Sequence, residues 1–309
     1  MIYTLTLNPA LDYWVQVQNF RTGQINRAVG ENLEAGGKGL NVSTVLHRLG
    51  IETTALGFLA GLTGMMVSAL IQSSGTPQDF ILLRDGSTRI NIKLHAQEET
   101  EINGIGAPID EDALQALYQK LDAMQDGDYL VLAGSVPSTV PGDIYCRIMK
   151  RYQDQKIKMN KKINFIVDTS GDVLKQSLAW HPFLIKPNHH ELGDLFGVKL
   201  HKTAEVVKYA QKLQDWGARN ILVSMAEKGA VLVCEDGEIY QQRAFRGDVK
   251  NSVGAGDSML AGFLTAYVRT GSLTQALNLG VAAGCASAFS ETLATKKEIL
   301  ELYKKFLQE

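Results

Sequence analysis

The chain has 309 residues, 33 acidic and 31 basic, with a formal net charge of −2, and 45% of its residues are hydrophobic. This composition is typical of a globular protein, and the balanced charge without a basic run argues against nucleic acid as the main partner. The sequence contains no apolar run of about 18 residues and no secretion signal, so we expect a cytoplasmic protein that does not cross a membrane.

The cysteines and histidines predict neither a disulfide framework nor a zinc-type metal site. Cys146, Cys234 and Cys285 are far apart in sequence and form no CxxC pair, which favours reduced thiols. His189-His190 is the only histidine pair, and adjacent residues on a helix do not face each other.

The N-terminal part predicts one buried strand followed by a small solvent-facing sheet. Ile2–Leu7 is a short β-rich run, and Asp12 follows it at the carboxyl end, where ligands bind in open α/β sheets; a plain turn residue is the alternative. Tyr13–Val17 and Ile25–Leu33 have mixed polarity and suit a lid. Arg27 in this lid is either a contact for an anionic substrate group or a solvated edge charge.

A glycine-rich stretch, Ala35-Gly-Gly-Lys-Gly-Leu-Asn-Val42, opens the next predicted helix. It matches neither GxxxxGK[ST] nor GxGxxG, which disfavours a Walker A loop and a dinucleotide site. Gly37 allows close backbone approach, and Lys38 and Asn41 share one face of the helix start. The stretch is either a cradle for a phosphorylated, hydroxyl-rich ligand or a loop with a solvated lysine.

Thr88–His95 alternates polar and apolar residues, which predicts a strand with a cationic face and an apolar face. Arg89 and Lys93 lie on the polar face, which suits a lid over an anionic sugar. The apolar face then needs a cover such as a second subunit, and an ordinary half-buried strand is the alternative. Thr100–Gly104 is the predicted return strand.

The remaining elements alternate between strand and helix patterns, typical of a doubly wound parallel sheet. The predicted strands are Thr53–Phe58, Phe80–Leu83, Tyr129–Ala133, Ile163–Val167, Phe183–Ile185, Asn220–Val223, Ala230–Cys234 and Glu238–Gln242. The predicted helices are Gly64–Ser73, Asp110–Met124, Asp143–Lys150, Thr203–Trp216, the one after Asp257, Leu273–Phe289 and Lys296–Phe306. Polar residues that follow strand ends are predicted to meet at one sheet edge, together with the two helix starts that follow the glycine-rich stretches; these polar residues are Asp12, Ser135, Asp168, Lys186, Asn188, Glu191 and Ser224.

A second glycine-rich stretch, Gly254-Ala255-Gly256, precedes Asp257 and a long apolar helix. Bare N–H groups and the helix dipole favour an anion at such a helix start, and a transferring phosphoryl group suits it. We expect Asp257 to take the proton of an attacking hydroxyl, with the dipole keeping it ionised and therefore a weak base. The alternative is a plain acidic N-cap.

Together, Ala35-Gly-Gly-Lys-Gly-x-Asn41 and Gly254-Ala-Gly-Asp257 followed by Ser-Met-x-Ala-Gly resemble the two signatures of the ribokinase-like (PfkB) carbohydrate kinases, over essentially the whole chain. The resemblance implies a single domain, residues 1–309, with a three-layer αβα, doubly wound, mostly parallel sheet. A small β-sheet lid is inserted from about 12–35 and 88–105. It also implies ATP as phosphoryl donor, Mg²⁺, and a homodimer formed through the lid.

Site residues are carried over by their positions in the matched motifs. Asp257 matches the catalytic base, and the N–H groups of Val253, Gly254, Ala255 and Gly256 match an anion hole. The sugar-phosphate site is matched by Asp12, Gly37, Lys38, Asn41 and Arg89, with Arg27 as a further candidate. Nucleotide-side positions are Lys186, Asn188, Ser224, Gly229 and Gly256, and Glu191 is assigned to Mg²⁺, directly or through water. Ala226 stands where relatives commonly have glycine.

Four further motifs resemble the members of this family that phosphorylate fructose 1-phosphate at its 6-hydroxyl to give fructose 1,6-bisphosphate and ADP. They are Thr6-Leu-Asn-Pro-Ala-x-Asp12, Thr88-Arg-Ile-Asn-Ile-Lys93, Thr100-Glu-Ile-Asn103 and Lys186-Pro-Asn-x-x-Glu191. Tagatose-6-phosphate kinases are the nearest alternative. A non-catalytic sugar-phosphate sensor is the remote one, and the missing GxGxxG disfavours a dinucleotide oxidoreductase.

Overall fold

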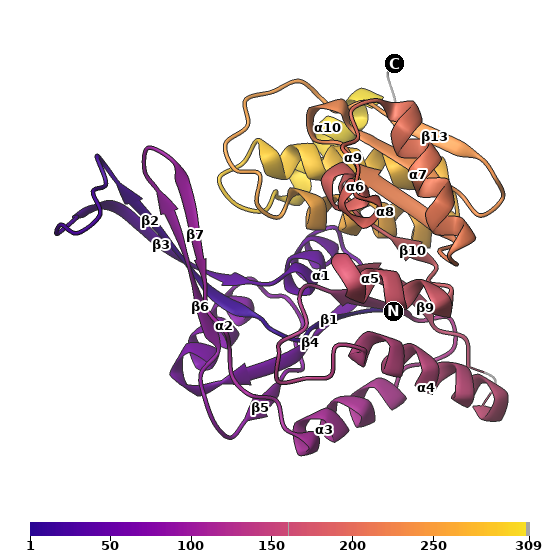
Figure 1. Cartoon of the computed structure of the whole chain (residues 1–309), viewed down its shortest axis with the longest axis horizontal. Coiled ribbons are helices and arrows are strands. Elements are labelled where there is room, and N and C mark those ends of the chain that lie inside the picture. The colour runs from indigo at the N-terminus through magenta and orange to yellow at the C-terminus, as the bar shows by residue number, and fades with distance from the viewer. Residues whose placement is uncertain (160, 307–309) are drawn as a thin grey trace.

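One large, mostly parallel β-sheet organises the chain, as the computed structural model of residues 1–159 and 161–306 shows (Figure 1). Within these residues the sheet has nine strands in the order β13-β12-β11-β10-β9-β8-β1-β4-β5. They are β1 (Ile2–Thr6), β4 (Thr53–Ala60), β5 (Ile81–Leu83), β8 (Tyr129–Ala133), β9 (Asn164–Asp168), β10 (Leu184–Ile185), β11 (Asn220–Ser224), β12 (Ala230–Val233) and β13 (Ile239–Gln242). The seven strands β11, β10, β9, β8, β1, β4 and β5 run parallel, while β12 pairs antiparallel with both β11 and β13.

Helices pack on both faces of this sheet, which confirms the predicted three-layer fold. One face carries α1 (Lys38–Arg48), α8 (Ala255–Thr270), α9 (Leu273–Ala288) and α10 (Lys296–Phe306). The other carries α3 (Glu111–Asp122), α4 (Ile144–Met159), α5 (Gly171–Ser177), α6 (His189–Phe196) and α7 (Thr203–Asp215), with the short helix η1 (Leu178–Trp180). Side chains of β8 alternate between the two cores, Leu130 and Leu132 into one, Val131 and Ala133 into the other. Burial on both faces explains why such strands read as continuous apolar runs.

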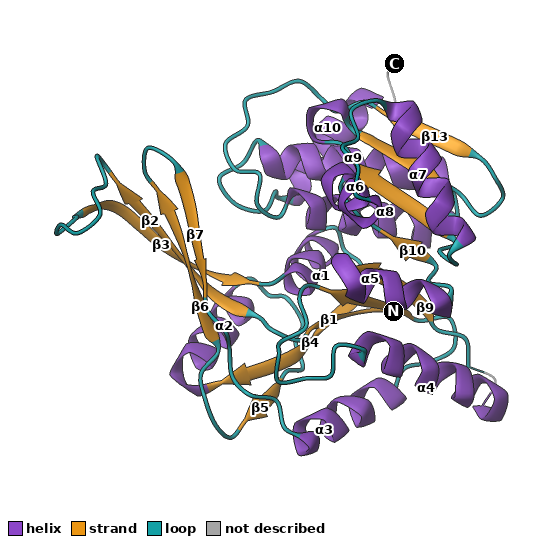
Figure 2. Ribbon diagram, in the orientation of Figure 1, coloured by secondary structure: helices purple, strands orange, loops and turns teal. Residues whose placement is uncertain are grey.

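A second, four-stranded sheet in the order β3-β2-β6-β7 forms the lid. Its strands are β2 (Ala10–Val17), β3 (Ala28–Gly36), β6 (Arg89–His95) and β7 (Glu99–Asn103). The lid projects away from the helix-covered sheet (Figure 2), and α2 (Gly61–Ser73) packs at its base. Because β2 begins and β3 ends beside the start of α1, residues near Asp12 and Gly36 lie close to that helix start, while the hairpin tip lies far from it.

Some predicted local structure is wrong. Strand β2 begins at Ala10 rather than at Tyr13, so Asp12 lies inside this lid strand. Strand β3 begins at Ala28, so Ile25–Arg27 lies outside it, because the Asn26 side chain bonds to backbone groups of Arg21 and Gln24 and shapes a loop. Helices α5 and α6 were not predicted, because with seven and eight residues they are too short to show the periodic apolar pattern of a helix.

Within the described ranges, no helix combines the length and the apolar character that crossing a bilayer requires.

Candidate active site

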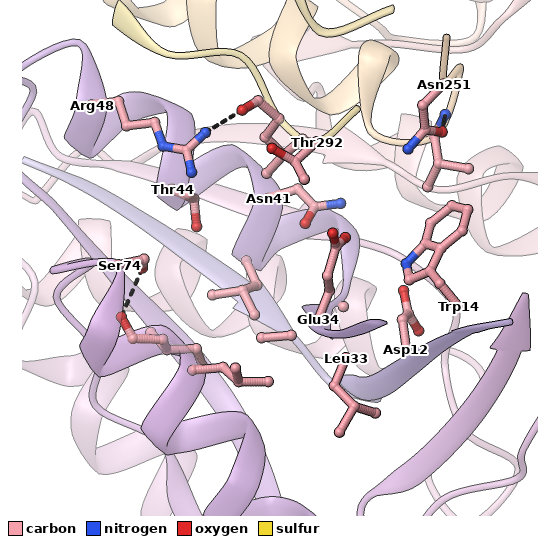
Figure 3. A pocket seen from close by; sticks show the side chains of 17 residues that line it. Asp12, Trp14, Leu33, Glu34, Asn41, Thr44, Arg48, Ser74, Asn251 and Thr292 are labelled. Carbon is pink, nitrogen blue, oxygen red and sulfur yellow. Dashed lines mark hydrogen bonds between the residues drawn. The ribbon is translucent and has the colours of Figure 1, made fainter. Parts of the chain in front are cut away.

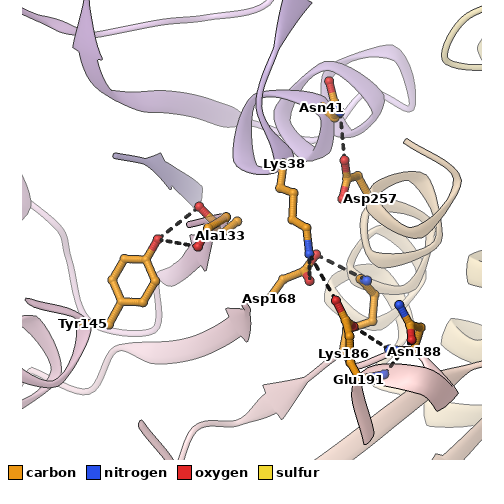
Figure 4. A network of polar contacts seen from close by, with 10 residues as sticks. Lys38, Asn41, Ala133, Tyr145, Asp168, Lys186, Asn188, Glu191 and Asp257 are labelled. Atoms are coloured by element: carbon orange, nitrogen blue, oxygen red, sulfur yellow. Dashed lines mark hydrogen bonds and ion pairs between the residues drawn. The ribbon is translucent and has the colours of Figure 1, made fainter. Parts of the chain in front are cut away.

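The two glycine-rich stretches meet through a side-chain hydrogen bond. Asn41 in the first turn of α1 donates from Nδ2 to Asp257 Oδ2 at 2.8 Å, across 216 residues of sequence (Figure 4). Helices α1 and α8 pack on the same face of the sheet, so their N-termini reach the same edge, where β1, β8, β9 and β11 also end. The predicted convergence of the two motifs is therefore present.

The start of α8 has the geometry of an anion site, with fewer free donors than the motif predicts. Gly254 is the N-cap with a φ of 76°, and a Cβ there would lie 2.5 Å from Leu293 Cδ2, so both conformation and space favour glycine. The Val253 N–H already donates to Asn251 Oδ1 at 2.9 Å, and the Ala255 N–H points to the Ser252 carbonyl at 3.3 Å. Over the described residues, the N–H groups of Gly254 and Gly256 have no protein acceptor.

Asp257 is buried, and its pKa is opposite in direction to the prediction. Burial and then the nearby Asp168 carboxylate raise the pKa of Asp257 to about 6, against the opposing effects of Lys186, Lys38 and Asn41. The helix dipole was expected to keep this group a weak base, but it acts over a short range while burial removes water from the whole carboxylate. A carboxylate with this pKa is a stronger base and is still mostly ionised at pH 7.

A second buried carboxylate, Asp168 at the end of β9, holds two lysines in place. Its Oδ1 lies 3.1 Å from Lys38 Nζ and its Oδ2 lies 3.3 Å from Lys186 Nζ. Burial opposes the charge on Asp168, yet Lys186 and Lys38 together lower its pKa, and Asp168 in turn raises the pKa of Lys38. The sequence placed Asp168 at the sheet edge but gave it no role, because only the tertiary structure brings the two lysines together.

Lys186 lies directly beside the predicted anion hole. A Cβ added to Gly256 would lie 3.1 Å from Lys186 Nζ, so the glycine makes room for the ammonium group. Lys38 Nζ lies 4.0 Å from Glu191 Oε1 on the other side of the cluster. The site therefore combines one base, two cations and free N–H donors within a few ångströms, which suits transfer of an anionic group.

Asn188 and Glu191 form a capping box at the start of α6. Asn188 Oδ1 accepts from the Glu191 N–H at 2.8 Å, and Glu191 Oε2 accepts from the Asn188 N–H at 2.8 Å. Glu191 Oε1 therefore stays turned toward Lys38 and the cluster. No group of three or more His, Cys, Asp or Glu side chains with metal-binding geometry occurs in the part of the chain that the structure describes.

Most of the predicted nucleotide residues line one large cavity of about 930 Å³. Asn188, Ser224, Gly229 and Gly256 are on its wall, while Lys186 approaches it through Gly256. Ala226 in the short helix η2 (Ala226–Lys228) adopts a φ of 50°, the left-handed conformation that glycine takes more easily. Ala226 therefore keeps the backbone conformation that a glycine would adopt here, and this conformation costs about 1–2 kcal/mol for a residue with a Cβ.

The predicted sugar-side residues divide into three groups. Asp12 and Asn41 line a smaller cavity of about 220 Å³ beside the lid (Figure 3), and Gly37 is the N-cap of α1 with a φ of 138°. Arg89 is held at the edge of the lid by donating from Nε to the Asn8 carbonyl at 3.1 Å. Arg27 is exposed at the far end of β3 and is not brought to the cluster within one chain.

A buried carboxylate, Asp257, lies beside two lysines, and residues next to it line a large and a smaller cavity; with the fold, this arrangement defines a small-molecule kinase with a ribokinase-like fold. Asn41, the partner of Asp257, lines the smaller cavity, and Gly256, its neighbour, lines the larger. The chain belongs to the pfkB family of carbohydrate kinases, whose model matches residues 6–299.

Named relatives and solved structures agree with this family. A 1-phosphofructokinase of Bacillus subtilis is 41% identical over 98% of this chain and 97% of its own length. A D-tagatose-1-phosphate kinase of Bacillus licheniformis is 35% identical over 95% and 94%. Phosphofructokinase-2 of Escherichia coli in complex with substrates and products superposes with a TM-score of 0.91 at 29% identity, covering 100% of this chain and 99% of that one.

The raised pKa of Asp257 predicts how kinase activity depends on pH. The carboxylate accepts a proton only when ionised, so kcat/KM for the sugar substrate should fall on the acid side with an apparent pKa of about 6. A profile of kcat/KM measured from about pH 4.5 to 8 reports this value for the free enzyme. An acid limb near the ordinary aspartate value of about 4 would contradict the burial argument.

Asp257→Asn is the matched control for this profile, because it keeps size and the contact with Asn41. Loss of the general base should lower kcat by about 10²–10⁴-fold and remove the acid limb. If the limb persisted in the variant, it would belong to another group.

Proposed function

We propose that the chain transfers the γ-phosphoryl group of ATP to the 6-hydroxyl of D-fructose 1-phosphate, giving fructose 1,6-bisphosphate and ADP. The observation that carries the proposal is the position of Asp257, whose partner Asn41 lines the small cavity and whose neighbour Gly256 lines the large one, with Lys38 and Lys186 held nearby by Asp168. The large cavity takes the nucleotide, the small cavity takes the sugar, and the phosphoryl group crosses between them at the start of α8.

Each part of the cluster has one task in this transfer. The sugar oxygen attacks the γ-phosphorus while its proton passes to the Asp257 carboxylate, and the bond to the β-phosphate oxygen breaks to release ADP. The N–H groups of Gly254 and Gly256 and the ammonium of Lys186 offset the charge on the transferring group. Lys38 faces the same point from the sugar side and also serves the existing phosphate of the substrate, together with Arg89.

The residues present also fit Mg²⁺ bound in the way that kinases use it. Mg²⁺ keeps several waters and takes one or two carboxylates plus substrate phosphates, so a preformed cage is not required. Glu191 Oε1 has the free orientation for this role, since Oε2 is already bound to the Asn188 N–H. When bound, the ion would neutralise charge on the phosphates of ATP.

D-tagatose 1-phosphate is the second candidate substrate. One relative of 35% identity is a D-tagatose-1-phosphate kinase, and this ketose differs from fructose 1-phosphate only in the configuration of one hydroxyl, at carbon 4. The catalytic cluster would be the same for both sugars. The difference in affinity must arise in the small cavity, where the hydroxyl groups bind.

A coupled assay of ADP release with Mg-ATP tests the proposal. We expect kcat/KM for fructose 1-phosphate to exceed the values for tagatose 1-phosphate, tagatose 6-phosphate and fructose 6-phosphate by about 10²-fold, which corresponds to about 2.7 kcal/mol in transition-state binding. A preference for a tagatose phosphate would reassign the substrate. Absence of turnover with all four sugars would leave a sugar-phosphate sensor.

We also propose that two chains associate through the lid. In register across the four strands, Leu33, Tyr13, Ile92 and Ile102 lie on one face, opposite the face of Asp12. Leu33, Ile90 and Ile102 are 37%, 45% and 58% exposed, which leaves this face uncovered in one chain. A second copy would cover it, and only a second copy could bring an Arg27 to the site.

Sedimentation at micromolar concentration tests this association. The wild type should sediment as an oligomer, and Ile102→Glu should shift it toward monomer because a charge is placed on the apolar face. Leu82→Glu is the matched control, since Leu82 is also exposed, at 72%, but lies on β5 of the large sheet. A monomeric wild type, or equal behaviour of the two variants, would contradict the lid interface.

A further inference from the structure

The wall of the small cavity carries a second carboxylate, Glu34, next to Asp12. Strands β2 and β3 pair Asp12 directly with Glu34, so both side chains leave the same face of the lid. On the other side of Asp12, Asn91 donates from Nδ2 to Asp12 Oδ1 at 2.8 Å. Asp12 is thus fixed by Asn91 on one side and has a like charge on the other.

Both carboxylates are partly removed from water, and across the described residues neither has a lysine or arginine nitrogen within ion-pair distance. Burial is the largest cause that raises the pKa of each, and for Glu34 the charge of Asp12 adds to it. More distant cations, Lys93 and Arg89 for Asp12 and Arg48 for Glu34, only partly oppose this rise. Glu34 Oε1 accepts a hydrogen bond from Asn32 Nδ2 at 3.0 Å. Two such groups in one cavity are costly unless a ligand donates hydrogen bonds to them.

The Trp14 indole is a hydrogen-bond donor on the same wall. Its Nε1 is buried near Glu34 without an acceptor in hydrogen-bond geometry, and it lines the same cavity as Asp12 and Glu34 (Figure 3). Arg48 lines the cavity too, but its guanidinium already donates to the Leu293 and Ala294 carbonyls. Two acceptors and one donor suit neighbouring hydroxyl groups, whereas the paired negative charges repel a phosphate.

We propose that Glu34 determines sugar specificity by accepting, together with Asp12, hydrogen bonds from neighbouring hydroxyl groups of the ketose. The pair fixes which hydroxyl configuration the cavity accepts and directs the phosphate of the substrate away from the two carboxylates, toward Arg89 and Lys38. This inference rests on the proposed function, because it takes a ketose phosphate as the ligand of the small cavity.

Steady-state kinetics of Glu34→Gln and Glu34→Ala test the proposal, with fructose 1-phosphate and its C4 epimer tagatose 1-phosphate as substrates. Both variants should raise KM for the preferred ketose by about 10- to 100-fold, the effect of losing a hydrogen bond to a charged group. The ratio of kcat/KM between the epimers should shrink. Glu34 does not touch the transfer site, so kcat and KM for ATP should change less than about threefold.

Glu98→Gln is the matched control, because Glu98 is exposed in the turn between β6 and β7 of the same lid and does not line the cavity. It should leave KM and the epimer ratio unchanged. An active wild type whose Glu34 variants keep both quantities, or lose only kcat, would overturn the specificity role alone. A wild type that phosphorylates neither ketose would overturn the proposed function and this inference with it.

Discussion

The bridge from Asp168 to Lys38 and Lys186 is the interaction on which the rest of the site depends. A fully buried carboxylate is strongly disfavoured unless cations compensate it, and here two ammonium groups at 3.1 and 3.3 Å do so. The carboxylate also holds both lysine side chains near the start of α8 before any substrate binds. Without it, the anionic substrate would have to order these side chains on binding. The same charge raises the pKa of Asp257, so one residue sets both the cations and the base.

The fold brings these groups together from four separate elements. Lys38 comes from α1, Asp168 ends β9, Lys186 follows β10, and Asp257 lies in the first turn of α8. A parallel sheet places its strand ends at one edge, and the N-termini of α1 and α8 face that edge. The lid contributes Asp12 and Glu34 from a different sheet, so in the proposed function the transfer site lies on the large sheet and the sugar hydroxyls are recognised from the lid.

Sequence patterns were sufficient for elements whose signal is local, and insufficient where tertiary contacts decide. The αβα layers and the convergence of the two helix starts on one sheet edge follow from apolar runs and glycine-rich stretches, whereas the hydrogen bond between Asn41 and Asp257 appears only in the structure. The pKa of Asp257 could not be predicted from the sequence, because burial and the Asp168 carboxylate raise it. Neither cause is visible in the motif Gly-Ala-Gly-Asp. Glu34 was not predicted as a site residue, because it is singled out only by its pairing with Asp12 across β2 and β3. For Arg27 the sequence left a substrate contact and a solvated edge charge both open, and within one chain a loop ordered by Asn26 places it exposed at the lid tip.

The most direct test of the central role of Asp168 is the pH dependence and rate of Asp168→Asn, with the exposed Asp172→Asn as control. Removal of the charge frees both lysines and takes away one cause of the raised pKa of Asp257. We expect kcat to fall by about tenfold or more and the acid limb of kcat/KM to move to lower pH, while Asp172→Asn behaves as wild type. An Asp168→Asn variant with wild-type kcat and an unmoved acid limb would contradict the view that this carboxylate organises the site.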